Sequence, residues 1–294
     1  MISTTISCNE LAQKIELIAI NSVKILFTTM ANAPASKPDL TMGLSSLYIP
    51  NSLLFDFEHE FVDKKQAFSN MMPSVEVFQC GAQNLGLSLD DEIIVYDDFG
   101  NFCASRAWFM LISMGFTNVK TLDGGLPTWI RGKYPTVTKV ATPQFTSDIQ
   151  IKPLSTMSFV DSQYISTRLA MLDSSAATAV SFQIIDARSN ARYTGTEPEP
   201  RANMRSGRIP RSVNIHYASL QNDGIFKSFN ELQSIFDYNN INLNEEIVTS
   251  CGSGITACIV AQAAFSIGAR RVNVYDASWS EWGASQTLPI EANQ

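Results

Sequence analysis

Two stretches of the chain share one pattern. The first is Gly115-Phe-Thr-Asn-Val-Lys-Thr-Leu-Asp123-Gly-Gly-Leu-Pro-Thr-Trp129, and the second is Gly268-Ala-Arg-Arg-Val-Asn-Val-Tyr-Asp276-Ala-Ser-Trp-Ser-Glu-Trp282. Glycine, aspartate and tryptophan recur at one constant offset. Further upstream, the Ile-Pro pair at 49–50 is matched by the pair at 209–210, and the apolar run 93–96 is matched by 247–250. A repeat this long indicates duplication of a whole domain, because solenoid and propeller units recur every 20 to 50 residues.

The second copy alternates short apolar runs with longer segments of helical character. The runs are 182–185, 213–215, 247–249 and 272–275. Ser228 and Glu231 predict a capping box that opens a helix through about Phe236, and residues 256–267 predict a buried helix that Gly268 ends. This is the α/β pattern. We therefore expect two tandem domains, each a mainly parallel sheet flanked by helices, over residues 1–140 and 156–294 with a linker at 141–155.

Composition limits the classes of partner. The 294 residues carry a net charge of -7 and are 45% hydrophobic, which predicts a folded protein and gives no reason to expect nucleic acid or an anionic membrane as a partner. No secretory leader or run of about 18 apolar residues can be drawn, so we expect a cytoplasmic protein outside the membrane. The five scattered cysteines and two histidines predict no disulfide framework, no metal site and no cofactor.

The loop Cys251-Gly252-Ser253-Gly254-Ile255-Thr256 follows one of the apolar runs and precedes the predicted helix. Glycines permit a loop whose amides surround one atom, and the helix start adds its positive dipole end. Such a loop would favour a thiolate, and then a persulfide anion, at Cys251. For an arbitrary cysteine, a buried structural role is the commoner alternative. We keep that role for Cys258, whereas the Gly-Ser-Gly loop favours a functional Cys251.

Two other loop chemistries fit less well. A Cys-x5-Arg phosphatase loop needs arginine six residues after the cysteine, where this chain has Ala257. Neither a G-x-G-x-x-G pattern nor a Walker pattern ending in Gly-Lys can be read here, so a nucleotide-binding loop is also disfavoured.

The loop, the segment Asp186-Ala-Arg-Ser-Asn-Ala-Arg-Tyr193 and the tail 275–283 resemble the two-domain rhodanese superfamily, and within it the 3-mercaptopyruvate sulfurtransferases. The resemblance implies one active site, because the first copy has Asp97 in the place of the catalytic cysteine. It implies sulfur transfer from 3-mercaptopyruvate through a Cys251 persulfide to a thiol or cyanide, with pyruvate released. A thioredoxin-like protein or a small thiol is the implied acceptor.

The loop also bears on the sulfur donor. Rhodaneses that use thiosulfate place an arginine and a lysine after the cysteine, whereas this chain has Gly252 and Ser253. An uncharged loop suits a monoanionic donor better than a dianion. A thiosulfate:cyanide sulfurtransferase and a non-enzymatic persulfide carrier remain the alternatives.

Family resemblance assigns substrate binding to Arg192 and Arg201, whose planar guanidinium groups can grip a carboxylate. By composition alone, a solvated loop in which Glu197 and Glu199 pair with these arginines is the simpler interpretation. Arg188, Arg205 and Arg208 are predicted to be ordinary surface charges.

Some enzymes of this family use a proton relay from the first domain to the loop serine, here Ser253. The resemblance makes Glu58 the acid, but the histidine position holds Asn70. His59 neighbours Glu58, and adjacent residues on a strand point to opposite faces. We therefore expect Ser253 to act with water, with Glu58 as a possible relay.

Overall fold

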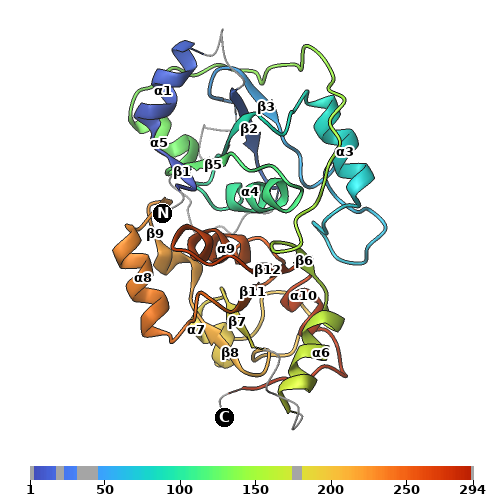
Figure 1. Cartoon of the computed structure of the whole chain (residues 1–294). Coiled ribbons are helices and arrows are strands. Elements are labelled where there is room, and N and C mark those ends of the chain that lie inside the picture. Colours follow the sequence, from blue (N-terminus) through green and yellow to red (C-terminus); the bar gives the residue numbers. More distant parts are fainter. Residues whose placement is uncertain (1–2, 18–22, 32–45, 174–180, 293–294) are drawn as a thin grey trace.

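The two halves of the chain form two sheets of the same topology (Figure 1). The structure, a computed structural model, describes residues 3–17, 23–31, 46–173 and 181–292. The first sheet has the order β1-β5-β4-β2-β3 and the second has the order β6-β12-β11-β7-β8. Every pair of neighbouring strands in both sheets is parallel. The expected duplication and fold class are thus confirmed.

The strands coincide closely with the apolar runs. The first sheet contains β1 (Thr5–Ile6), β2 (Val23–Thr28), β3 (Ser52–Leu54), β4 (Glu92–Asp97) and β5 (Val119–Leu122). The second contains β6 (Phe159–Val160), β7 (Phe182–Asp186), β8 (Ser212–Asn214), β11 (Glu246–Ser250) and β12 (Val272–Tyr275). All of β11 and nearly all of β4 is buried, as expected of central strands that are covered on both faces. A small hairpin, β9 (Gln221–Asn222) and β10 (Ile225–Phe226), lies outside the sheets.

Helices cover the sheets and connect their parallel strands. They are α1 (Cys8–Leu17), α3 (Val75–Asn84), α4 (Ala104–Ser113), α5 (Gly125–Arg131), α6 (Ser162–Asp173), α7 (Asn190–Thr194), α8 (Phe229–Tyr238), α9 (Ala257–Ser266) and α10 (Trp279–Trp282), with a short 3-10 helix at Tyr217–Leu220. The predicted capping box is present, because Ser228 accepts from the Glu231 amide and the Glu231 side chain accepts from the Ser228 amide. The predicted linker lies between Val137 and Phe159, where the chain has neither helix nor strand.

The two domains meet along α4 and α9, which lie side by side between the sheets (Figure 1). Every residue of α4 is buried, and so are the first eight residues of α9. One hydrophobic core therefore runs from the first domain into the second. Because α9 directly follows the Cys251 loop, this shared core fixes the loop relative to both domains.

Candidate active site

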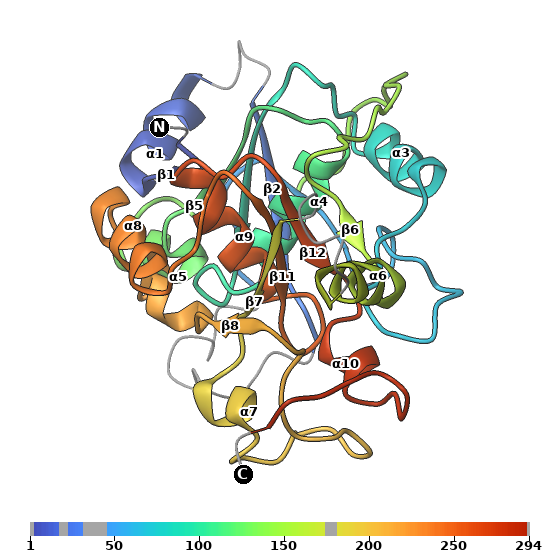
Figure 2. The ribbon, with the colours of Figure 1, turned by 60° about the horizontal axis from the view of Figure 1, so that its bottom comes forward.

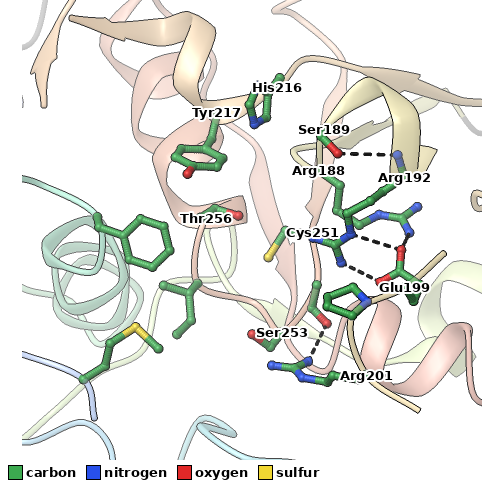
Figure 3. Close-up of a pocket in the computed structure, with 15 residues that line it drawn as sticks. Arg188, Ser189, Arg192, Glu199, Arg201, His216, Tyr217, Cys251, Ser253 and Thr256 are labelled. Atoms are coloured by element: carbon green, nitrogen blue, oxygen red, sulfur yellow. Dashed lines mark hydrogen bonds and ion pairs between the residues drawn. The ribbon is translucent and has the colours of Figure 1, made fainter. Parts of the chain in front are cut away.

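A pocket lies where strands of the second sheet end. Strands β7, β8 and β11 are neighbours and parallel, so their carboxyl ends meet at one edge, where α7 also lies (Figure 2). The pocket has a volume of about 410 Å³. It is lined by Met30, Phe102, Arg188, Ser189, Arg192, Glu199, Pro200, Arg201, His216, Tyr217, Cys251, Gly252, Ser253, Ile255 and Thr256 (Figure 3). The cysteine and both substrate-binding arginines predicted from the sequence therefore share one pocket.

Cys251 lies at the base of this pocket and is 2% exposed. Its amide donates to Ser278 Oγ at 3.0 Å, and its carbonyl accepts from the Trp279 amide at 3.0 Å. Gly254 has φ +75°, and a Cβ there would stand 2.3 Å from the Asp276 carbonyl oxygen. Only glycine allows this turn, because the left-handed conformation and the close backbone approach both exclude a side chain.

The backbone of the loop presents unpaired donors. Within the described residues, the amides from Gly252 to Thr256 donate no hydrogen bond to another protein group. They precede α9, whose N-terminal end adds a positive partial charge. A run of free amides beside a helix start is an anion-binding arrangement. The loop can therefore stabilise a thiolate or the terminal sulfur of a persulfide.

Arg192 and Arg201 approach this loop from α7 and the segment after it. Arg192 Nη2 would be only 3.2 Å from a Cβ at position 252, so the glycine leaves room for the guanidinium. Arg201 Nη1 donates to the Gly252 carbonyl at 3.3 Å and to Ser280 Oγ at 2.5 Å. Two guanidinium groups thus flank the cysteine loop.

Arg192 also forms an ion pair with Glu199, which was the alternative that composition favoured. Its Nη2 lies 2.5 Å from Glu199 Oε2, while its side chain remains 23% exposed. The carboxylate of Glu199 is 2% exposed and also pairs with Arg188. This pair holds the guanidinium at the pocket wall, so the two interpretations of Arg192 are compatible.

The prediction that Arg188 is a surface charge is wrong. Its side chain is 1% exposed, lies 2.6 Å from Asp186 Oδ2 and 2.8 Å from Glu199 Oε1, and stacks 4.0 Å above the Trp279 ring. Arg205 is likewise only partly exposed and donates to the carbonyls of Trp282 and Leu288. The sequence did contain one indication that Arg188 is buried near the site. It lies two residues after the end of β7, a strand that neighbours β11.

His216 and Tyr217 are pocket residues that the sequence did not indicate. They follow β8, whose carboxyl end meets the same edge as that of β11 through β7. Their rings meet edge to face at a centroid separation of 4.9 Å. Figure 3 shows both on the side of Cys251 opposite Arg201 and Ser253. The order of the strands therefore brings His216 into the pocket of Cys251, although the two residues are far apart in the sequence.

The residues discussed for a relay lie elsewhere in the first domain. The Glu58 carboxylate accepts from the Ala31 amide at 2.8 Å, next to the pocket residue Met30, but Glu58 itself does not line the pocket. Glu58 and His59 lie in a turn beyond the end of β3, so the assumption that they lie on a strand is wrong. Asp56 forms this turn by accepting from both of their amides.

A buried arginine from the first domain also reaches the cysteine loop. Arg106, on α4, is fully buried and lies 2.7 Å from Asp276 Oδ1. Its guanidinium donates to the Gly254 carbonyl at 3.2 Å and to the Asn70 carbonyl at 2.5 Å. The Met72 amide completes the contact by donating to Asp276 Oδ2 at 2.6 Å. The first domain therefore helps to fix the shape of the cysteine loop.

The described part of the chain offers neither a metal-binding cluster nor a membrane-spanning helix. Among residues 3–17, 23–31, 46–173 and 181–292, no group of three or more His, Cys, Asp or Glu side chains could hold a metal ion. No helix within these ranges is long and apolar enough to cross a membrane.

Comparison with known proteins gives a consistent result. The family model of the rhodanese-like domain matches residues 45–131 and 169–285. A 3-mercaptopyruvate sulfurtransferase from Escherichia coli is 33% identical over 92% of both chains. A thiosulfate sulfurtransferase from Rattus norvegicus is 34% identical over 80% of this chain and 77% of its own. The crystal structure of an E. coli 3-mercaptopyruvate sulfotransferase superposes with a TM-score of 0.77 at 28% identity, covering 95% of this chain and all of that one.

Proposed function

Because the chain belongs to the rhodanese superfamily of sulfurtransferases, we propose that it is a 3-mercaptopyruvate sulfurtransferase that carries sulfur as a persulfide on Cys251. The observation that supports this most directly is the pocket itself, in which Cys251 shares the cavity with two guanidinium groups and a loop of unpaired amides. The arginines suit the carboxylate and ketone of an α-keto acid, and the amides suit the sulfur anion.

The geometry at position 252 supports the choice of donor. Relatives of both donor classes match the chain at similar identity, so similarity alone does not separate mercaptopyruvate from thiosulfate. Arg192 lies against Gly252, and a cationic side chain there would displace or repel its guanidinium. An uncharged loop with arginines beside it fits a donor whose carboxylate binds away from the sulfur. Mercaptopyruvate has this shape, whereas thiosulfate carries its charge on one compact group.

The reaction proceeds in two halves. The Cys251 thiolate attacks the sulfur of mercaptopyruvate held by Arg192 and Arg201, the carbon–sulfur bond breaks, and pyruvate leaves after its enolate takes up a proton. The loop amides, with Ser253 at the pocket wall, stabilise the persulfide anion. A second thiol or cyanide then removes the outer sulfur, which gives the ping-pong kinetics of covalent catalysis. A thioredoxin-like acceptor and a cytoplasmic location stay predictions.

Intact mass spectrometry after incubation with mercaptopyruvate tests the assignment of the cysteine. The protein should gain one sulfur atom, mapped to Cys251, and Cys251→Ser should abolish both this gain and pyruvate release. Cys80→Ser is the matched control, because Cys80 is exposed and lies outside the pocket. Sulfur found on another cysteine, or pyruvate release by Cys251→Ser, would contradict the proposal.

Steady-state kinetics of Arg192→Lys and Arg201→Lys test substrate binding. Lysine keeps the charge but loses the planar fork, and a charged hydrogen bond contributes about 1.5–3 kcal/mol, so KM for mercaptopyruvate should rise about 10- to 100-fold. Arg270→Lys is the control, because Arg270 is exposed at the far end of α9. An unchanged KM would favour a persulfide carrier, and faster turnover with thiosulfate than with mercaptopyruvate would favour a rhodanese.

A further inference from the structure

His216 lines the pocket and has no role in the two half-reactions described so far. It follows β8 and lines the same cavity as Cys251, Arg192 and Arg201 (Figure 3). The other histidine of the chain, His59, is exposed and pairs with Asp56 outside the pocket. His216 is thus the imidazole that the fold places in the pocket of the reacting cysteine.

The surroundings of His216 keep its ring neutral and available. It is half-buried, and its ring nitrogens form no hydrogen bond with any described residue. Burial, and then the positive charge of Arg192, lower the pKa of the imidazole below its usual value of about 6.5. The ring packs against Tyr217, whose own pKa is raised by burial and then by the charge of Cys251. Arg192 and Tyr217 are therefore the charged or titratable groups that act on His216 directly, and Cys251 lines the same pocket.

The chemistry of the first half-reaction requires one proton to move. Mercaptopyruvate brings a thiol proton, and pyruvate leaves with an additional hydrogen on carbon. When the Cys251 thiolate forms the S–S bond, the electron pair of the C–S bond stays on carbon as the enolate. Carbon is thereby reduced and sulfur oxidised, with no external oxidant. The outer sulfur must lose its proton to become the persulfide anion, and the enolate must gain one.

We propose that His216 is the proton relay of this half-reaction: its neutral imidazole takes the proton from the transferred sulfur and returns it to the pyruvate enolate. The imidazole ends the cycle neutral, and every atom is conserved. This inference rests on the proposed function, because it presumes that mercaptopyruvate binds in the pocket. In this proposal His216 carries out the proton transfer that was expected of Ser253 acting with water.

The other polar groups of the pocket are less suited to this transfer. The guanidinium groups of the arginines stay protonated, and the Glu199 carboxylate is 2% exposed and occupied by two ion pairs. Tyr217 stays protonated, since burial and then the charge of Cys251 raise its pKa, so it offers no phenolate to accept the thiol proton. Neither Glu58 nor Asn70 lines the pocket. An imidazole near its own pKa both accepts and donates, which is the property that a relay needs.

Single-turnover release of pyruvate by the full-length enzyme tests the proposal. His216→Gln should lower this rate about 100-fold with little change in the mercaptopyruvate concentration at half saturation, since general acid–base catalysis typically contributes at least this factor. In the unmodified enzyme the rate should fall as the pH drops through the lowered pKa of His216, because the protonated ring cannot accept a proton. His216→Gln should lose this acid limb. His59→Gln should keep both the rate and the limb.

Chemical rescue separates a relay from a structural role. Added imidazole should restore pyruvate release in His216→Ala, where removal of the ring enlarges the cavity, but not in Cys251→Ser. The proposal is overturned if His216→Gln keeps the rate and its pH profile, if imidazole gives no rescue, or if Tyr217→Phe alone shows the loss. If the unmodified enzyme releases no pyruvate from mercaptopyruvate, the proposed function fails and the relay fails with it. If it releases pyruvate and the His216 variants behave normally, only the relay fails.

Discussion

The loops after β4 and β11 occupy equivalent places in the two domains, but the first has an aspartate where the second has a cysteine. In the first domain the Asp97 carboxylate accepts four backbone hydrogen bonds of 2.7 to 3.1 Å, from the amides of Phe99, Asn101, Cys103 and Ala104. In the second domain Cys251 stands at the equivalent position, and the amides after it have no partner in the described residues. The duplicated fold thus builds two anion-binding loops, and only one of them is left for a substrate.

The two loops also differ in how far other parts of the chain cover them. The hairpin of β9 and β10 covers the Asp97 loop of the first domain. The Gly224 carbonyl in this hairpin accepts from the Gly124 amide at 3.2 Å and from Asn101 Nδ2 at 3.4 Å. Among the residues that the structure describes, none forms such a hydrogen-bonded cover over the Cys251 loop, and Cys251 faces the pocket. The Asp97 carboxylate occupies the amides of the first loop permanently. The amides after Cys251 stay available for the persulfide anion that we propose to form there.

Cys251→Asp should make the active loop resemble the silent one and has the largest expected effect. Persulfide formation should be lost completely, because a carboxylate cannot accept sulfur. The new carboxylate should accept the loop amides, so the free energy of unfolding should be at least that of Cys251→Ser. Mass spectrometry and urea unfolding measure the two effects. A less stable protein than Cys251→Ser would show that the two loops differ in shape as well as in side chain.

Arg106→Met should disturb the contact through which the silent domain holds the active loop. It leaves Asp276 buried without its charged partner, and removing one partner of a buried ion pair costs about 3–5 kcal/mol of unfolding free energy. The rate per folded molecule should also fall, because Gly254 loses its donor. Arg106→Lys, which keeps the charge, is the matched variant and should lose less. A change below about 1 kcal/mol in Arg106→Met would show that this ion pair does not hold the loop.

Asp98→Asn tests a smaller effect, the destabilisation caused by a buried carboxylate next to Asp97. Burial raises the pKa of Asp98 to about 6, and its Oδ1 has no hydrogen-bond partner. The folded protein therefore keeps a proton that the unfolded chain releases, and stability falls as the pH rises from about 4 to about 6. Asp98→Asn should remove this slope and stabilise the protein by up to about 3 kcal/mol at pH 7, but not at pH 4, because one unit of pKa shift corresponds to about 1.4 kcal/mol. Exposed Asp90→Asn should keep the slope in thermal unfolding scans.

Local features of the sequence predicted most of the fold. The apolar runs became β7, β8, β11 and β12, because buried parallel strands need continuous apolar residues. The capping box at Ser228 and the end of α9 before Gly268 also followed from neighbouring residues alone. The cysteine loop was also legible as a contiguous motif, and the resemblance named Arg192 and Arg201, which the structure places in the same pocket. Each of these depends on contacts within a few residues or on a contiguous motif.

The sequence by itself determined that the chain contains two copies of one α/β domain, with a cysteine loop in one and Asp97 in the other. Only the tertiary structure decided which distant residues surround Cys251. The order of the strands places Arg188 and His216 at the edge of β11, and the packing of α4 on α9 brings Arg106 to Gly254. The physical reason is that side-chain periodicity acts along a strand, whereas the order of strands across a sheet is set by long-range packing.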